Sequence, residues 1–139
     1  MNVHEIVTTY KAEGGTSQVK AQAIAAQLSQ SIESEVAAGA INVEFDIVIP
    51  FAQIKAFLLS ITKKSGQAPA AVAGPMTIKT NSTTTPDDTF VIKTDLALAY
   101  GDGDPSGNPV GVDITKIYVT NPGDAVADFV LRALLDPTP

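Results

Sequence analysis

The most constraining feature of this sequence is a series of short apolar runs, each closed by turn-forming residues. In the first clear run every second position is apolar: Ile41, Val43, Phe45, Ile47 and Ile49. Successive side chains of a β-strand point to opposite faces, so this spacing predicts a strand with one face on a core. Pro50 predicts the end of the strand, because proline has no amide hydrogen to donate to a neighbouring strand.

Similar runs continue along the chain. We expect further strands at residues 3–11, 56–63, 76–80, 89–94, 112–120 and 126–135, separated by turns such as Pro86-Asp87-Asp88 and Asn121-Pro122-Gly123. Many short strands with frequent turn signals predict an all-β sandwich or barrel. The chain has 139 residues, of which 45% are hydrophobic and 17% charged. This composition is globular, and the length predicts a single domain over residues 1–139.

Residues 20–38, KAQAIAAQLSQSIESEVAA, do not follow this pattern clearly. Ile24, Leu28, Ile32 and Val36 recur every four residues, and the stretch is rich in good helix formers. Local propensity therefore favours a helix that ends at Gly39. The alternative is a pair of strands, at about residues 17–27 and 31–37, followed by a turn at Ala38-Gly39.

Charge and cysteine content exclude several classes of function. Acidic residues outnumber basic ones by 15 to 9, and the net charge is −6. An acidic chain with dispersed lysines argues against nucleic-acid binding, which needs a clustered positive surface. No apolar run is long enough for a membrane span, and the start of the chain lacks a signal-peptide pattern. With no cysteine, the chain has neither a disulfide framework nor a thiolate metal site.

Residues 102–113, DGDPSGNPVGVD, come closest to a metal-binding motif. Asp102, Asp104 and Asp113 stand near ligand positions of a calcium loop, and Gly107 stands at its turn position. Against calcium, the last ligand is not the longer glutamate, two prolines stiffen the loop, and a strand follows it. We therefore predict no metal site and keep the three aspartates as a weak candidate. The preferred interpretation is an exposed acidic loop.

Other chemistry is sparse, and we expect no catalytic site and no cofactor. His4 is the only histidine, and in an N-terminal strand it lacks the partner residues that a catalytic triad or a zinc site needs, so we expect it to be a surface strand residue. Asp87 and Asp88 are adjacent, and adjacent side chains on a strand face opposite ways. The tract at 82–85, STTT, lacks the flanking glycines of a nucleophile motif. We expect the five phenylalanines mostly in the core, and Tyr100 near solvent.

The order of several segments resembles small β-sandwich proteins of tailed bacteriophages that decorate the capsid. The resemblance covers roughly residues 30–139, and its marks are Thr80-Asn81-Ser82, Pro86-Asp87-Asp88, the strand at 113–121 (DITKIYVTN) and the ending at 136–139 (DPTP). These are turns and strand edges, so they speak mainly to fold. The sequence departs from the group at 66–75, which looks like an insertion, and at 100–111, which is more acidic.

This resemblance implies an antiparallel, jelly-roll-like β-sandwich of about eight strands, and it favours strands over a helix at 20–38. It also implies a capsid decoration, or cement, protein made in the host cytoplasm. Such a protein binds the major capsid protein on the virion exterior as a monomer or a homo-oligomer, dimer or trimer. We expect the shell contacts at the first strand, the apolar loop 68–73 or the C-terminal tail.

The alternative function is a ligand- or glycan-binding β-module of a phage tail or spike, with calcium dependence as one form of it. A ligand that binds only the folded state would raise its stability. Thermal stabilisation by calcium or a glycan would therefore separate this alternative from a decoration protein.

Overall fold

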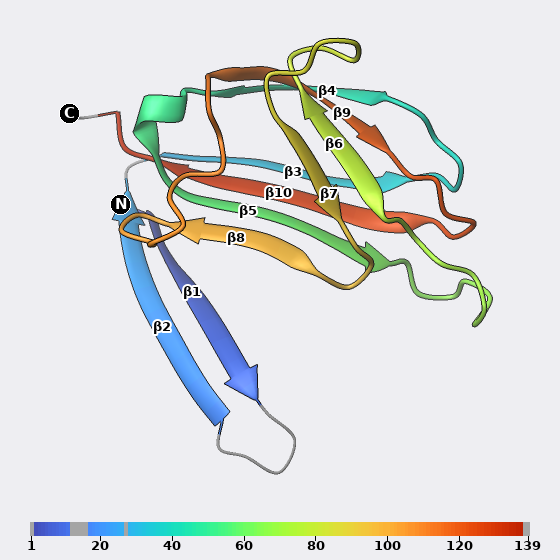
Figure 1. Ribbon diagram of the computed structural model, residues 1–139, viewed down its shortest axis with the longest axis horizontal. Coiled ribbons are helices and arrows are strands. Elements are labelled where there is room, and N and C mark those ends of the chain that lie inside the picture. Colours follow the sequence, from blue (N-terminus) through green and yellow to red (C-terminus); the bar gives the residue numbers. More distant parts are fainter. Residues whose placement is uncertain (1, 12–16, 27, 138–139) are drawn as a thin grey trace.

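The chain folds as an antiparallel β-sandwich, seen in a computed structural model that describes residues 2–11, 17–26 and 28–137, with side chains from residue 28 onward. Within the described residues, eight strands form two four-stranded sheets, and two further strands form a separate hairpin (Figure 1). The prediction of an all-β antiparallel sandwich of about eight strands is confirmed. Its jelly-roll connectivity stays a prediction.

The first sheet contains, in spatial order, β3 (Leu28–Val36), β10 (Ala127–Leu135), β5 (Ile54–Lys63) and β8 (Ala97–Gly101). The second contains β4 (Val43–Ile49), β9 (Ile114–Thr120), β6 (Met76–Thr80) and β7 (Thr89–Ile92). A short 3-10 turn, η1 (Phe51–Gln53), joins β4 to β5. No helix in the described part of the chain is long and apolar enough to cross a membrane.

The core lies between the inner faces of the two sheets. In β5 and β10 the register places Phe57 opposite Ala133, and Ile61 opposite Phe129, and all four residues are buried. Phe129 also meets Phe45 of the second sheet, with ring centroids 6.1 Å apart. Alternate residues of each strand therefore supply one continuous apolar layer, as a sandwich requires.

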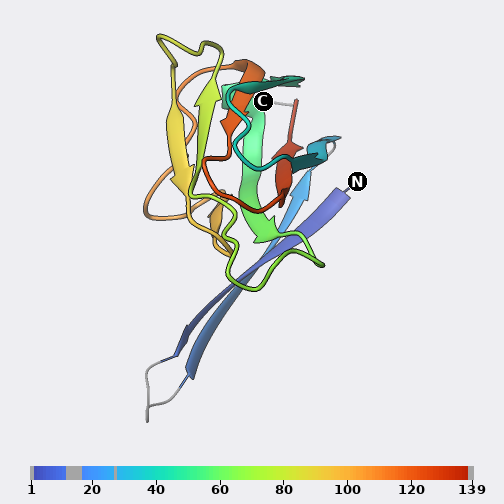
Figure 2. The same cartoon turned by 90° about the vertical axis from the view of Figure 1, so that its right-hand side faces the viewer.

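The N-terminal hairpin consists of β1 (Asn2–Lys11) and β2 (Ser17–Ala26), paired antiparallel from Asn2↔Ala26 to Lys11↔Ser17. We call it the arm. It contacts β5, β8 and β10 of the first sheet. Figures 1 and 2 show its two strands leaving the sandwich together and extending well beyond it. The arm is thus an appendage on the first sheet and not a strand pair within it.

Two strands, β2 and β3, occupy most of the stretch where helix propensity was high. The prediction of strands at 17–27 and 31–37 is confirmed, and Ala38-Gly39 forms the turn after them. Every residue of β3 from Leu28 to Val36 has a partner in β10. This pairing outweighs the local preference of alanine and glutamine for helix.

The expectation that Tyr100 lies near solvent is wrong. Tyr100 is only 8% exposed, because it belongs to β8, a strand that the sequence patterns did not predict. In the register with β5 it stands opposite the buried Phe57. Tyr100 therefore packs on the inner face of the first sheet, next to the start of the acidic loop.

Two apolar residues expected in the core are exposed instead. Ile41 is 76% exposed, since β4 begins only at Val43 and Ile41 lies in the preceding turn. Phe51 is 42% exposed at the start of η1. Alternation along a run thus predicted the face of the strand correctly but not where the strand begins or ends.

Candidate functional site

The acidic loop 102–113 joins β8 to β9, and its three candidate aspartates face different partners. Asp102 pairs with Lys55 at 3.3 Å. Asp104 accepts a hydrogen bond from the Ser106 hydroxyl, and Asp113 accepts one from the Phe51 amide at 2.9 Å. Among the residues that the structure describes, no group of three histidine, cysteine, aspartate or glutamate residues gathers as metal ligands. A calcium loop directs its oxygens to one point, and this loop does not.

The paired aspartates Asp87 and Asp88 form hydrogen bonds within and between loops. Asp88 accepts a hydrogen bond from the Gly111 amide, and Asp87 accepts one from the side chain of Asn81. Asn81 also bonds the backbone of residues 113 and 115. The paired aspartates thus serve two separate contacts. The side chain of His4 lies outside those that the structure describes.

A charged cluster lies on the outer face of the second sheet. Lys116 sits between Glu44, at 2.9 Å, and Asp46, at 3.2 Å, and the Tyr118 hydroxyl donates a hydrogen bond to Glu44. Hydrogen bonds to Glu44 and Asp46 raise the pKa of Lys116 and so favour its charged form. Exposed pairs of this kind contribute little stability, and we assign the cluster no binding role.

We predict that tyrosine ionisation weakens the fold at high pH. Burial, and then the nearby charge of Asp102, raise the pKa of Tyr100 above the ordinary 10.0. Loss of hydration and the bond to Glu44 do the same for Tyr118. The unfolded chain then loses these protons first, so stability is fully present below pH 10.0 and falls as pH rises through the raised pKa values.

The measurement is the free energy of unfolding as a function of alkaline pH, together with the ultraviolet tyrosine titration. Tyr100→Phe should make the alkaline fall in stability shallower, because it removes one of the two linked protons. If the difference spectrum between wild type and Tyr100→Phe shows this residue ionising at or below its ordinary pKa, the burial argument fails.

Comparison of the chain with protein-family models, with curated proteins and with solved structures gave no match. The candidate site must therefore be judged from the surfaces of the sandwich itself. Three of them were predicted as partner contacts: the first strand, loop 68–73 and the C-terminal tail.

Loop 68–73 is firmly attached to the sandwich. The Val72 carbonyl accepts a hydrogen bond from the Ala125 amide at 3.1 Å, and the Val72 amide donates one to the Asp124 carboxylate at 2.6 Å. The Lys63 ammonium donates to the carbonyl of Ala68, and Ala73 is fully buried. The exposed residues of this loop are Ala68, Pro69, Ala70 and Val72, and Val72 is 51% exposed.

The C-terminal tail is tied down at its start. The Asp136 amide donates to the carbonyl of Gln53 at 2.8 Å, which holds the chain after β10 against η1. Pro137, the last residue described, is exposed. The tail prediction beyond it concerns Thr138 and Pro139, which lie outside the described residues.

The first strand belongs to the arm, the most prominent of the three surfaces. The register places Val3 with Ala25, Val7 with Ala21 and Thr9 with Val19, so most of the alternating positions on this face of the arm are apolar, although Glu5 and Lys11 belong to the same face. A two-stranded hairpin alone is at best marginally stable in water. A projecting arm with an apolar face is therefore suited to lie against another molecule.

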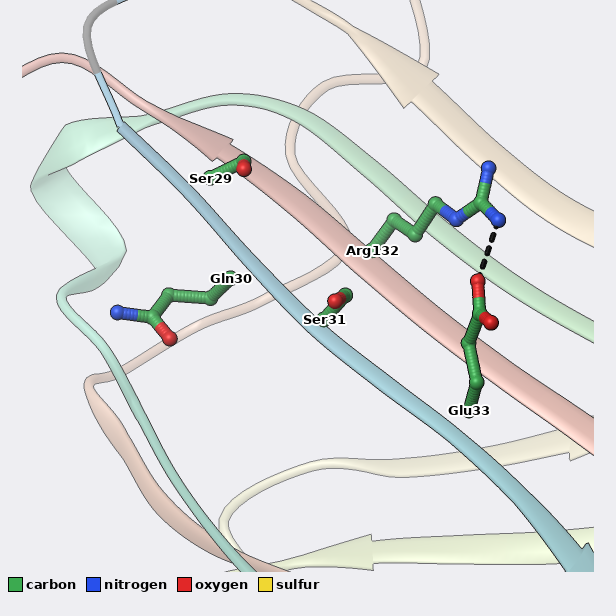
Figure 3. A pocket seen from close by; sticks show the side chains of 5 residues that line it. All are labelled: Ser29, Gln30, Ser31, Glu33 and Arg132. Carbon is green, nitrogen blue, oxygen red and sulfur yellow. Dashed lines mark hydrogen bonds and ion pairs between the residues drawn. The ribbon is translucent and has the colours of Figure 1, made fainter.

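One surface was missed by sequence reasoning: the outer side of β3, at the edge of the first sheet. An open depression of about 280 Å³ is lined there by Ser29, Gln30, Ser31, Glu33 and Arg132. Figure 3 shows the short serine side chains on β3 and the ion pair between Arg132 and Glu33 beside them. We call this surface the β3 notch. The residues LSQSIESEV carry no signal that this strand lies at an edge, so the surface could not be located from sequence.

Proposed function

We propose that this protein is a capsid decoration protein, which binds the major capsid protein on the outside of a bacteriophage particle and stabilises the shell. The observation that carries the proposal is the arm, which extends from a self-contained sandwich. The resemblance of residues 30–139 to phage decoration proteins supports the same function.

The arm supports this function because of what a decoration protein must do. Such a protein clamps neighbouring coat subunits, so it needs a contact that reaches beyond its own footprint. The paired strands of the arm are ten residues each, and both have an edge unpaired within the described residues. A coat subunit can bury the apolar face or extend the two strands into a sheet. The repeated copies of a shell then add many such contacts together.

We further propose that the sandwich is a jelly roll. Its four strand pairs are nested along the chain: β3 pairs with β10, β4 with β9, β5 with β8, and β6 with β7. A long hairpin folded over twice produces this nesting and distributes the pairs between two sheets. Jelly rolls are common in viral capsid and lectin domains, so this connectivity supports a virion protein.

Quantitative mass spectrometry of purified virions tests the proposed function. We expect the chain in virions of the phage that encodes it, in a copy number comparable to that of the coat subunits or of their local symmetry axes. A trace amount, or none, contradicts the proposal. Recovery only with isolated tails favours the ligand-binding module instead.

A matched pair of variants tests the role of the arm. Val7→Glu with Val19→Glu places charges on the apolar face of its projecting part. This variant should keep the melting temperature of wild type and lose most co-sedimentation with coat shells, because buried unpaired charges oppose docking. Thr8→Glu with Lys20→Glu changes the opposite face and is the control. Equal binding by both variants and wild type would remove the arm from the proposal.

A further inference from the structure

The edge strand β3 has the best surface for pairing with another strand. It is nine residues long and, in the described part of the chain, pairs on one side only, with β10. The other edges of the sandwich are less suitable. β7 has four residues, β8 has five, and β4 has a register irregularity between Asp46 and Ile49. An open, regular edge presents a row of backbone donors and acceptors to any approaching strand.

The charges near β3 do not block this edge. Glu33 is paired with Arg132 of β10, and Glu35 is paired with Lys64 at 2.7 Å. Arg132 belongs to β10 and Lys64 follows β5, so both partners lie on the side of β3 opposite its open edge, and the two carboxylates are directed over the sheet (Figure 3 shows the first pair). Edges that resist pairing usually carry unpaired charges or prolines, and β3 has no proline.

We propose that β3 pairs antiparallel with β3 of a second copy of this chain, about a twofold axis at Ile32. The first sheets of the two copies then form one continuous eight-stranded sheet. This inference does not depend on the proposed function.

The register follows from length and charge. With the axis at Ile32, all nine residues of β3 find partners, and Glu33 and Glu35 stand opposite the partner's Ser31 and the partner's Ser29. Moving the axis to Glu33 places two glutamates directly opposite each other, which is unfavourable. Moving it to Ser31 leaves two residues of each strand unpaired. Only the register at Ile32 pairs the whole strand without opposing like charges.

The β3 notch complements this register. Ser29 and Ser31 are short, and the depression above them has room for the longer glutamate side chains of a second strand. Ser31 is also the register partner of Arg132, so a second carboxylate arriving at Ser31 approaches that guanidinium. Strand pairing of this length makes a small interface, and we expect a weak, reversible dimer.

Sedimentation equilibrium of the full chain, compared with charge variants at Ser29, tests the proposal. Ser29→Glu places like charges opposite each other at two symmetric positions and should weaken dimerisation by roughly threefold to thirtyfold. Ser29→Lys should strengthen it. Adding Glu35→Lys to Ser29→Glu should restore it towards wild type. Thr89→Glu, an exposed change on the edge strand β7, is the control and should leave dimerisation unchanged.

Cysteine cross-linking tests the register itself, since the natural chain has no cysteine. A mixture of Ser31→Cys and Glu33→Cys chains should form a disulfide between copies, because these positions are opposite each other. Either variant alone should cross-link poorly, since like positions are then too far apart for a disulfide. A monomer at every soluble concentration overturns the proposal. So does a dimer that ignores the charges at position 29 or cross-links equally well in all three samples.

Discussion

Replacing Asn121 with alanine is expected to lower the free energy of unfolding by about 3–5 kcal/mol. Asn121 is fully buried, in the turn between β9 and β10. The two hydrogens of its side-chain nitrogen are shared among the carbonyl oxygens of Val36, Ala37 and Ala125. Its side-chain oxygen accepts hydrogen bonds from the amides of Gly74 and Gly123. Alanine leaves most of these groups without a partner and away from water.

Urea denaturation of the two chains, followed by circular dichroism, measures this loss. Gln30→Ala, which removes an exposed amide from β3, is the matched control and should change stability by less than about 0.5 kcal/mol. Asn121→Asp should be at least as harmful as alanine, because it keeps the shape but turns a donor towards the carbonyls into an acceptor. An aspartate variant as stable as wild type would show that the bonds of Asn121 contribute little.

The second large effect is expected in the core, where Phe129→Ala should cost about 3–5 kcal/mol of stability. Phe129 is fully buried on the inner face of β10 and contacts Phe45 across the sandwich. Removing its ring loses buried apolar surface and leaves a cavity between two sheets that can collapse only partly. For a domain of this size, such a loss is a large share of a total stability of roughly 5–15 kcal/mol.

Phe51→Ala is the matched control, since it removes the same ring from an exposed position on η1. It should cost well under half as much as Phe129→Ala in the same urea experiment. Similar losses for the two variants would mean that the ring of Phe129 does not lie between the sheets.

The sequence predicted the strands well where β-branched residues alternate with polar ones. Residues 76–80 form β6 with the expected bounds, and 41–49 became β4 with only its start misplaced. The strand β8 was missed because Ala97 and Ala99 carry no β signal, and its strand state comes from pairing with β5. Tyr100 was misplaced for the same reason. A strand that is stabilised mainly by pairing with a distant segment shows no local sequence pattern from which it could be predicted.

The surfaces were predicted less well than the strands. The arm was anticipated as a first strand, but its projection depends on how the hairpin meets the first sheet. The spacing of Asp102, Asp104 and Asp113 is a local pattern, whereas their oxygens are directed by Lys55, Phe51 and Ser106. The β3 notch could not be located from sequence, because nothing in LSQSIESEV says that this strand lies at an edge.

We propose that the protein binds a capsid shell through an arm extended from its β-sandwich. A cryo-electron microscopy map of the assembled particle tests it most directly. We predict density for the sandwich on the outer surface of the shell, with β1 and β2 lying across a neighbouring coat subunit. A map in which the sandwich is absent from the shell, or bound with its arm directed into solvent, would contradict the account.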